Sequence, residues 1–263
     1  MTNVEVDTRA SRWNHDAVFS SAWAYDLAFA WDAAPEIRVV LGLAQLATGE
    51  GSHLLLPACG TGRYAHALAQ LGFHVSASDI NEEMLALARA ERSHPRVSYA
   101  MADMTRRLPG EELFDAAFTF NNSFRYILDE ADVRGHLEAV YQRLRPGAAY
   151  VIDLGLTRAD DPCGQGARWT VRHGDRIVRA SWTLQSVAPP LSLELARIVV
   201  EEPDGAVHEV VAEQPQRIWS FTALAALASS VGFRVSGAHR RNGATAPDPS
   251  RSGRYYVVLV RPL

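Results

Sequence analysis

The stretch LLLPACGTGR, residues 54–63, joins an apolar run to a glycine-containing turn, and the amphipathic segment YAHALAQL follows it. The run predicts a buried strand, and the spacing of apolar residues after it predicts a helix. Glycines between them let the backbone approach a ligand at the carboxyl end of the strand, where open α/β sheets bind ligands. This turn is therefore the first candidate binding site.

The same alternation continues after this stretch. Strand-like runs at residues 73–79, 96–103, 113–120 and 148–156 alternate with helical patterns at 81–92 and 131–144. Gly72 closes the first helix, and Pro146-Gly147 stops the helix that ends at Leu144. We read Arg134 and Arg143, beside Glu138, as part of a solvated helix face. Alternating strands and helices predict a parallel sheet with helices on both faces.

The flanking segments differ from this pattern. Helical spacing at residues 14–31 and 35–47 predicts two helices within an N-terminal lid, residues 1–50. Residues 167–217 show strands joined by HGDR, APP and EPDG turns, which predicts an antiparallel sheet inserted at 158–217. The main domain then comprises residues 51–157 and 218–263. Its last two strands lack a helix between them and should pair antiparallel, and we read residues 240–254 as a mobile loop.

Composition excludes several function classes. The formal net charge is -4 and acidic and basic residues are interspersed, so the sequence shows no basic face that would bind nucleic acid. The chain has no Lys, which excludes Schiff-base and P-loop lysines. No apolar run reaches the ~18 residues that span a membrane, and the polar N-terminus lacks a signal-peptide pattern. The nine His and two Cys show no metal-ligand spacing. We expect a cytoplasmic protein without a metal, nucleic-acid or membrane partner.

Asp79 stands at the end of the second predicted strand. A carboxylate there can accept hydrogen bonds from both hydroxyls of a ribose, in a nicotinamide dinucleotide or in an adenosyl cofactor. Alternatively, Asp79 caps the helix that begins near Asn81-Glu82. The glycine turn also satisfies the dinucleotide-binding pattern, or is a tight turn without a ligand. At this point the residues leave these alternatives open.

Several segments together resemble the class I S-adenosylmethionine-dependent methyltransferases. PACGTGR is similar to the glycine motif of that family, SASDIN to its ribose-binding strand end and MADM to its adenine-contacting turn. FDAAFTFNNSFRYI resembles its fourth strand, and LRPGAAYVIDL resembles its loop and fifth strand. The resemblance covers residues 54–153 and the last strands. It implies a Rossmann-like methyltransferase sheet with an antiparallel last strand, and S-adenosylmethionine as the cofactor.

The resemblance also implies residue roles. Asp103 would meet the adenine amino group and Met104 the adenine ring. The cofactor-binding residues so implied are Ala58, Cys59, Gly60, Thr61, Gly62, Arg63, Asp79, Ile80, Asp103, Met104 and Asn121. The family has an acidic residue where this chain has Leu56, and a first glycine where it has Ala58. At these two positions the chain lacks the residues that contact the methionine ammonium indirectly in the family.

Within the family, the layout is most similar to small-molecule N-methyltransferases of the amino-sugar and glycine/sarcosine kind. They share a lid with a Tyr-Asp pair, here Tyr25-Asp26, and an antiparallel insertion after the fifth strand. We expect Tyr25 and Tyr126 to position a small-molecule acceptor, an amine or else a hydroxyl. Other residues expected near the acceptor site or in the lid are Asn122, Ser123, Trp13, His15 and Trp31.

Three further hypotheses accompany this interpretation. The inserted sheet either covers the acceptor pocket or joins two subunits of a homodimer, since its Trp169 and Trp182 must be buried. A nicotinamide-dependent oxidoreductase would share the glycine turn and Asp79. A non-catalytic binding protein on a methyltransferase scaffold would explain Leu56 and Ala58.

Overall fold

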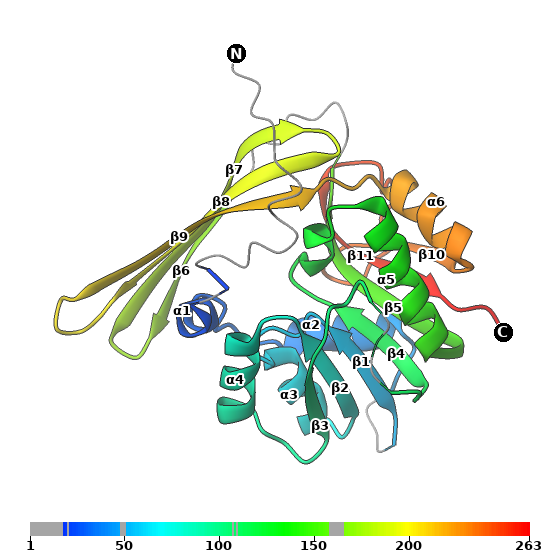
Figure 1. Ribbon diagram of the computed structural model, residues 1–263, viewed down its shortest axis with the longest axis horizontal. Coiled ribbons are helices and arrows are strands. Elements are labelled where there is room, and N and C mark those ends of the chain that lie inside the picture. Colours follow the sequence, from blue (N-terminus) through cyan, green and yellow to red (C-terminus); the bar gives the residue numbers. More distant parts are fainter. Residues whose placement is uncertain (1–17, 20, 48–50, 107, 109, 158–165) are drawn as a thin grey trace.

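A computed structural model describes residues 18–19, 21–47, 51–106, 108, 110–157 and 166–263. One sheet of seven strands has the order β3-β2-β1-β4-β5-β11-β10 (Figure 1). Its strands are β1 (His53–Pro57), β2 (His74–Asp79), β3 (Val97–Met101), β4 (Phe114–Thr119), β5 (Leu144–Leu156), β10 (Arg234–His239) and β11 (Gly253–Val260).

The strand order creates a crevice beside β1. From β1 the chain passes outward to β2 and β3, and it then returns to β4 on the other side of β1. Such a reversal of direction separates the loops that follow β1 and β4, and open α/β sheets bind ligands there. Strands β1 to β5 run parallel, whereas β11 pairs antiparallel with both β5 and β10. The predicted fold class, including the antiparallel last strand, is confirmed.

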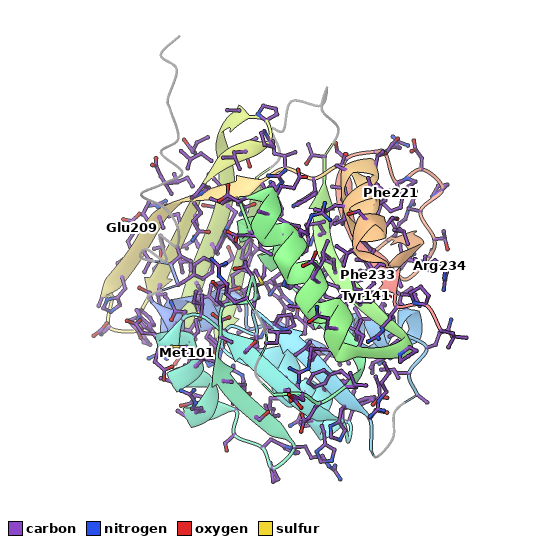
Figure 2. All side chains as sticks on the ribbon, turned by 45° about the vertical axis from the view of Figure 1, so that its right-hand side comes forward. Met101, Tyr141, Glu209, Phe221, Phe233 and Arg234 are labelled. Atoms are coloured by element: carbon purple, nitrogen blue, oxygen red, sulfur yellow. The ribbon has the colours of Figure 1, made fainter. Side chains whose placement is uncertain are left out.

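Helices cover both faces of this sheet because its strands bury alternate residues on opposite sides. Leu54 and Leu56 of β1 pack in a core with α2 (Ala34–Leu43) and α3 (Arg63–Gln70). Leu55 packs in a second core with α5 (Glu130–Arg143) and α6 (Phe221–Val231). Figure 2 shows Tyr141 of α5 beside Phe233, with ring centroids 5.1 Å apart. Two short elements follow β2 and β4, α4 (Glu82–Glu91) and the 3-10 helix η1 (Ser123–Tyr126).

The predicted insertion forms a separate antiparallel sheet of four strands in the order β6-β7-β8-β9. Its strands are β6 (Ala167–His173), β7 (Arg176–Ala188), β8 (Leu191–Glu201) and β9 (Val207–Arg217). In Figure 1 the sheet arches over α1 (Ala22–Ala28), and aliphatic residues of β7 and β8 share a core with α1. The lid helix and the inserted sheet therefore pack as one cover.

Both N-terminal helices are shorter than the sequence predicts. Helix α1 covers Ala22–Ala28, and the segment 14–17 lies outside the described residues. Helix α2 ends at Leu43 rather than 47, because Gln45 adopts a left-handed backbone conformation with φ of 57°. Pro35 stands in the first turn of α2.

One expectation about an arginine was wrong. Arg143 is buried rather than solvated, and its guanidinium donates hydrogen bonds to the carbonyls of Leu108, Gly110 and Glu112. Arg143 thereby provides donors for the backbone carbonyls of a bend in the chain, a role that the spacing of apolar residues cannot reveal. Within residues 240–254, which the sequence predicts to be mobile, Arg241 forms ion pairs with Glu36 and with Asp153; the mobility stays a prediction. Within the described residues, no helix is both long and apolar enough to span a membrane.

Candidate active site

The glycine turn connects β1 to α3 through three left-handed residues. Ala58, Gly60 and Gly62 have φ of 55°, 56° and 78°. A Cβ on Gly62 would lie 2.5 Å from the Tyr99 hydroxyl oxygen, so this position has no room for a side chain. A Cβ on Gly60 would meet no atom within 4 Å. The turn is thus closed against β3 behind it and open at Gly60.

Asp79 belongs to this turn rather than to the helix after it. One carboxylate oxygen accepts a hydrogen bond from the Gly60 amide at 2.7 Å, and the other accepts one from the Asn81 amide at 3.0 Å. The cap of α4 is Asn81, whose side-chain oxygen accepts from the Met84 amide at 3.0 Å. The capping alternative for Asp79 is therefore wrong.

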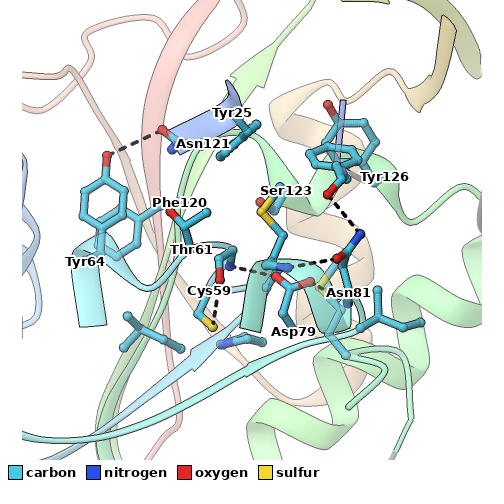
Figure 3. Close-up of a pocket in the computed structure, with 18 of the residues that line it drawn as sticks. Tyr25, Cys59, Thr61, Tyr64, Asp79, Asn81, Phe120, Asn121, Ser123 and Tyr126 are labelled. Carbon is cyan, nitrogen blue, oxygen red and sulfur yellow. Dashed lines mark hydrogen bonds between the residues drawn. The ribbon is translucent and has the colours of Figure 1, made fainter. Parts of the chain in front are cut away.

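One pocket opens at the carboxyl ends of β1, β2 and β4 (Figure 3). Both predicted tyrosines and ten of the eleven residues expected to bind the cofactor line it; Gly62 does not appear in the lining. The lining residues among those predictions are Tyr25, Ala58, Cys59, Gly60, Thr61, Arg63, Asp79, Ile80, Asp103, Met104, Asn121 and Tyr126. Parallel strands bring these loops together, since their carboxyl ends share one edge of the sheet.

The turn after β3 is organised by hydrogen bonds of its own. Asp103 accepts from the Thr105 amide at 2.8 Å and from the Thr105 hydroxyl at 2.7 Å, which holds its carboxylate at the pocket wall. The Met104 carbonyl accepts a hydrogen bond from Nδ1 of buried His136 at 2.9 Å. The second ring nitrogen of His136 lies 2.7 Å from the Tyr150 hydroxyl. His136 of α5 and Tyr150 of β5, both distant from Met104 in sequence, thereby hold its backbone in place.

Helix α1 is joined to the glycine turn through Asp26. The Thr61 hydroxyl donates to one Asp26 oxygen at 2.5 Å, and Arg92 pairs with the other at 2.8 Å. This places the neighbouring Tyr25 at the pocket, and burial raises the pKa of Tyr25 to about 12. Its hydroxyl therefore stays protonated at neutral pH. Trp31 is absent from the pocket lining, and Trp13 and His15 lie outside the described residues.

Asn121 and Asn122 form the turn after β4 with left-handed φ of 53° and 61°. The Asn121 amide donates to buried Asp153 at 3.0 Å, and the Asn122 side chain accepts from the Gly155 amide at 2.6 Å. Asp153 also holds Arg254 through two hydrogen bonds of 2.7 Å. Strand β5 thus sets the position of the Asn121 turn.

Sequence reasoning offered the inserted sheet as a cover of the acceptor pocket but assigned none of its residues to the site. Trp182 of β7 and Gln214 with Pro215 of β9 line the pocket. Gln214 accepts a hydrogen bond from the Tyr126 hydroxyl at 2.7 Å. A signal existed in the alternation of these strands, where polar residues interrupt an otherwise apolar face. Aromatic residues also concentrate here, eight in all: Phe19, Tyr25, Phe29, Tyr64, Phe118, Phe120, Tyr126 and Trp182.

Comparison with known proteins agrees with this geometry. Residues 55–147 match a family model described as a methyltransferase domain. The match begins in β1 and ends at Gly147 in β5, so it contains the glycine turn, Asp79 and Asp103. Over these residues the resemblance to a methyltransferase is confirmed, and the small-molecule N-methyltransferase type stays a prediction.

Relatives of the methyltransferase domain extend the comparison. A Geobacillus sp. (strain WCH70) protein named for methyltransferase activity is 32% identical over 138 residues, 52% of this chain and 55% of that protein. The cypemycin N-terminal methyltransferase of a Streptomyces species is 25% identical over 253 residues, 90% of this chain and 94% of its own. The chain spans about half the length, or less, of the first curated relatives that it matches.

Two solved structures share the fold over nearly the whole chain. DesVI from Streptomyces venezuelae has a TM-score of 0.77 at 22% identity, covering 92% of this chain and 98% of its own. CalS10, an amino pentose methyltransferase from Micromonospora echinaspora with S-adenosylmethionine bound, has a TM-score of 0.72 at 20% identity, covering 90% and 96%. The uncovered shares, 8% and 10% of this chain, are smaller than the inserted sheet, so at least part of the insertion belongs to the shared fold.

Proposed function

We propose that this protein transfers the methyl group of S-adenosylmethionine to an amine of a small molecule. The observation that carries the proposal is the pocket itself. It joins the glycine turn and Asp79, at the sheet edge where the methyltransferase domain is matched, to tyrosines from α1 and η1. Four elements distant in sequence thereby meet around one cavity.

The residues present fit an adenosyl cofactor. The free space beside Gly60 lets the cofactor approach the backbone of the turn. Asp79 stands at the end of β2, where the resemblance implies that the ribose binds. Ile80 and Met104 supply apolar contacts for a base, with the Asp103 carboxylate next to them. When bound, S-adenosylmethionine supplies a methyl group activated by a positively charged sulfur. The aromatic rings around the pocket suit that charge, because ring faces attract cations.

The departures Leu56 and Ala58 do not remove the cradle. Ala58 adopts the left-handed conformation, with φ of 55°, that glycine adopts more easily, so the turn forms without the family's first glycine. Leu56 is buried in the sheet core at 1% exposure. The methionine ammonium therefore has no carboxylate at position 56, and other pocket residues must hold it.

The chain's own residues favour an amine acceptor. An ammonium must lose a proton before it attacks, and a buried aromatic pocket lowers the pKa of an amine. Tyr25, with its raised pKa, remains able to hydrogen-bond a neutral nitrogen. The relatives named for N-methylation that align along most of this chain support the same choice. Attack needs no strong protein nucleophile, so alignment and exclusion of water are the remaining tasks of the pocket.

The cofactor half of the proposal is tested by calorimetry with S-adenosylhomocysteine. Asp79→Ala removes two charge-assisted hydrogen bonds to the ribose, each worth roughly 1.5–3 kcal/mol, so affinity should fall at least tenfold. Asp175→Ala, in the exposed turn between β6 and β7, is the matched control and should bind like wild type. Equal affinity of wild type and Asp79→Ala, with both folded, would reject the placement.

The acceptor half is tested by release of S-adenosylhomocysteine over a panel of matched primary amines and alcohols. Methylation of amines supports the proposal, and methylation of the alcohols alone would replace the amine with a hydroxyl acceptor. Cofactor binding without turnover on either set would favour a non-catalytic scaffold. Binding of NADH in place of S-adenosylhomocysteine would instead favour an oxidoreductase.

A further inference from the structure

The inner face of the inserted sheet changes character where it meets the pocket. Along β8, the alternate residues Ala196, Ile198 and Val200 are aliphatic and share a core with α1. Toward the other end of β8 the same face carries Ser192 and Glu194. The facing positions of β9 are Gln216 and Gln214, which pair with Ser192 and Glu194 in register. Four polar side chains thus occupy the end of the sheet next to η1.

Gln214 is the member of this group that reaches the cavity. Gln214 lines the pocket although it is only 2% exposed. Its Oε1 accepts a hydrogen bond from the Tyr126 hydroxyl at 2.7 Å. Its Nε2 has no hydrogen-bond partner among the residues that the structure describes. Several buried side-chain atoms in the described part of the chain lack a hydrogen-bond partner. Among the residues that carry these atoms, only Gln214 lines the pocket.

The hydrogen bond from Tyr126 sets the orientation of the Gln214 amide. A phenolic hydroxyl that donates its hydrogen must meet an acceptor, and the acceptor of an amide side chain is its oxygen, so Oε1 faces Tyr126. The Nε2 end of the amide is therefore the end without a partner. A buried donor left unpaired costs roughly 1–3 kcal/mol, which a ligand atom would offset.

We propose that Gln214 reads the methyl acceptor, its Nε2 donating a hydrogen bond to a hydroxyl oxygen, and that the acceptor is an amine bearing a hydroxyl group. This inference rests on the proposed function and names the substrate class for that same pocket. Tyr126 is then a positioning residue, which acts by holding the Gln214 amide. Its expected direct role in contacting the acceptor is replaced by this indirect one.

Charge near Gln214 favours a neutral oxygen over an anionic one. Arg125, the nearest cation of this group, is already engaged by Glu194 at 3.4 Å, by the Arg217 carbonyl at 3.2 Å and by Ser192 at 3.4 Å. Glu194 stands directly opposite Gln214 in the sheet and would repel a carboxylate or phosphate. The pair leaves a locally neutral wall, which suits an alcohol.

The test compares ring amines that differ by one hydroxyl. Wild type is assayed with cyclohexylamine and with 2-, 3- and 4-aminocyclohexanol, and kcat/KM is measured for each. We expect one aminocyclohexanol to exceed cyclohexylamine by about tenfold or more, since a site built around a hydroxyl discriminates strongly against its absence. In Gln214→Leu that ratio should fall below about threefold. Tyr126→Phe should also lower the ratio, because the Gln214 amide then lacks the hydroxyl donor that orients it.

Controls separate specificity from folding. Gln185→Leu makes the same change at an exposed position of the same sheet and should keep the wild-type ratio. S-adenosylhomocysteine affinity, measured for each variant, reports whether the cofactor site is intact. Equal kcat/KM for all four amines in wild type, or an unchanged ratio in Gln214→Leu, would overturn the inference and leave amine methylation standing. Failure of wild type to methylate any amine would overturn both.

Discussion

At the scale of single residues, backbone conformation and burial do more to define this site than charge does. Ala58 stands in a left-handed conformation between the buried strand β1 and the pocket. A Cβ in that conformation lies close to the following carbonyl, at a cost of roughly 1–2 kcal/mol. Glycine removes this strain but loses more backbone entropy on folding, which cancels part of the gain.

We therefore predict that Ala58→Gly raises the free energy of unfolding by up to about 1 kcal/mol. Urea denaturation at pH 7 measures this difference. A variant with lower stability than wild type would show that the Ala58 methyl makes packing contacts worth more than the strain it causes.

His136 couples stability to pH. Burial lowers the pKa of its imidazole from 6.5 to about 4, because a site without water disfavours the charged ring. The folded-state pKa lies below the unfolded one, so the unfolded chain binds the proton first as pH falls. This contribution is complete above pH 6.5 and is lost as pH falls toward 4.

From pH 7 to pH 4.5, His136 should thus reduce the free energy of unfolding by about 2–3 kcal/mol. We predict that His136→Gln, which does not titrate, loses less stability than wild type over this range by that amount. Urea unfolding curves at the two pH values give the comparison. Parallel losses in both proteins would mean that the ring is charged in the folded state.

At the scale of elements, the inserted sheet and α1 complete a cavity that the main sheet leaves open. The ends of the insertion lie together, since Leu156 forms a bridge with Trp219 and the Thr157 amide donates to the Trp219 carbonyl at 2.8 Å. A short linker can therefore replace the insertion without moving β5 or α6.

We predict that replacing residues 158–217 with a short Gly-Ser linker preserves S-adenosylhomocysteine binding but abolishes turnover. The cofactor turn, Asp79 and Asp103 lie outside the deleted segment, whereas Gln214 and Trp182 lie within it. Calorimetry and methyl-transfer assays on the same preparation measure the two properties. A folded deletion variant with full turnover would show that the sheet has no part in the acceptor site.

At the scale of the whole molecule, Asp153 links distant parts of the chain. This carboxylate is 1% exposed in β5 and pairs with Arg254 of β11 and with Arg241 of the loop before it. Arg241 also pairs with Glu36 of α2, while the Asn121 amide bonds Asp153 from the pocket side. The network joins lid, sheet edge and pocket.

Removing Asp153 takes a buried acceptor away from Arg254, whose side chain is 36% exposed, and from the Asn121 amide. Asp153→Ala should lower the free energy of unfolding by about 2–3 kcal/mol, the cost of leaving such donors unpaired, whereas the double variant Asp153→Leu, Arg254→Met should recover part of the loss, since it leaves no unpaired charge at position 254. Urea denaturation of the three proteins tests this. A loss below about 1 kcal/mol in the single variant would contradict the proposed importance of the network.

Local patterns in the sequence determined the main sheet and most of the lining of the candidate pocket. Strand and helix periods repeat every few residues, and parallel pairing then brings the ends of β1, β2 and β4 to one edge. Asp79 and the glycine turn meet for this reason. Even the turns of the inserted sheet followed from short motifs, and its strands match the expected segment.

Tertiary structure alone decided which surfaces meet. Alternation along the strands puts Trp182 of β7 and Gln214 of β9 on one face of the inserted sheet, but it does not show that this face closes over η1. The burial of Arg143 and the anchoring of Arg241 depend on carbonyls and carboxylates supplied by other elements. Such contacts join residues about 30 to more than 100 positions apart. Their energies come from docking and desolvation, which no local pattern encodes.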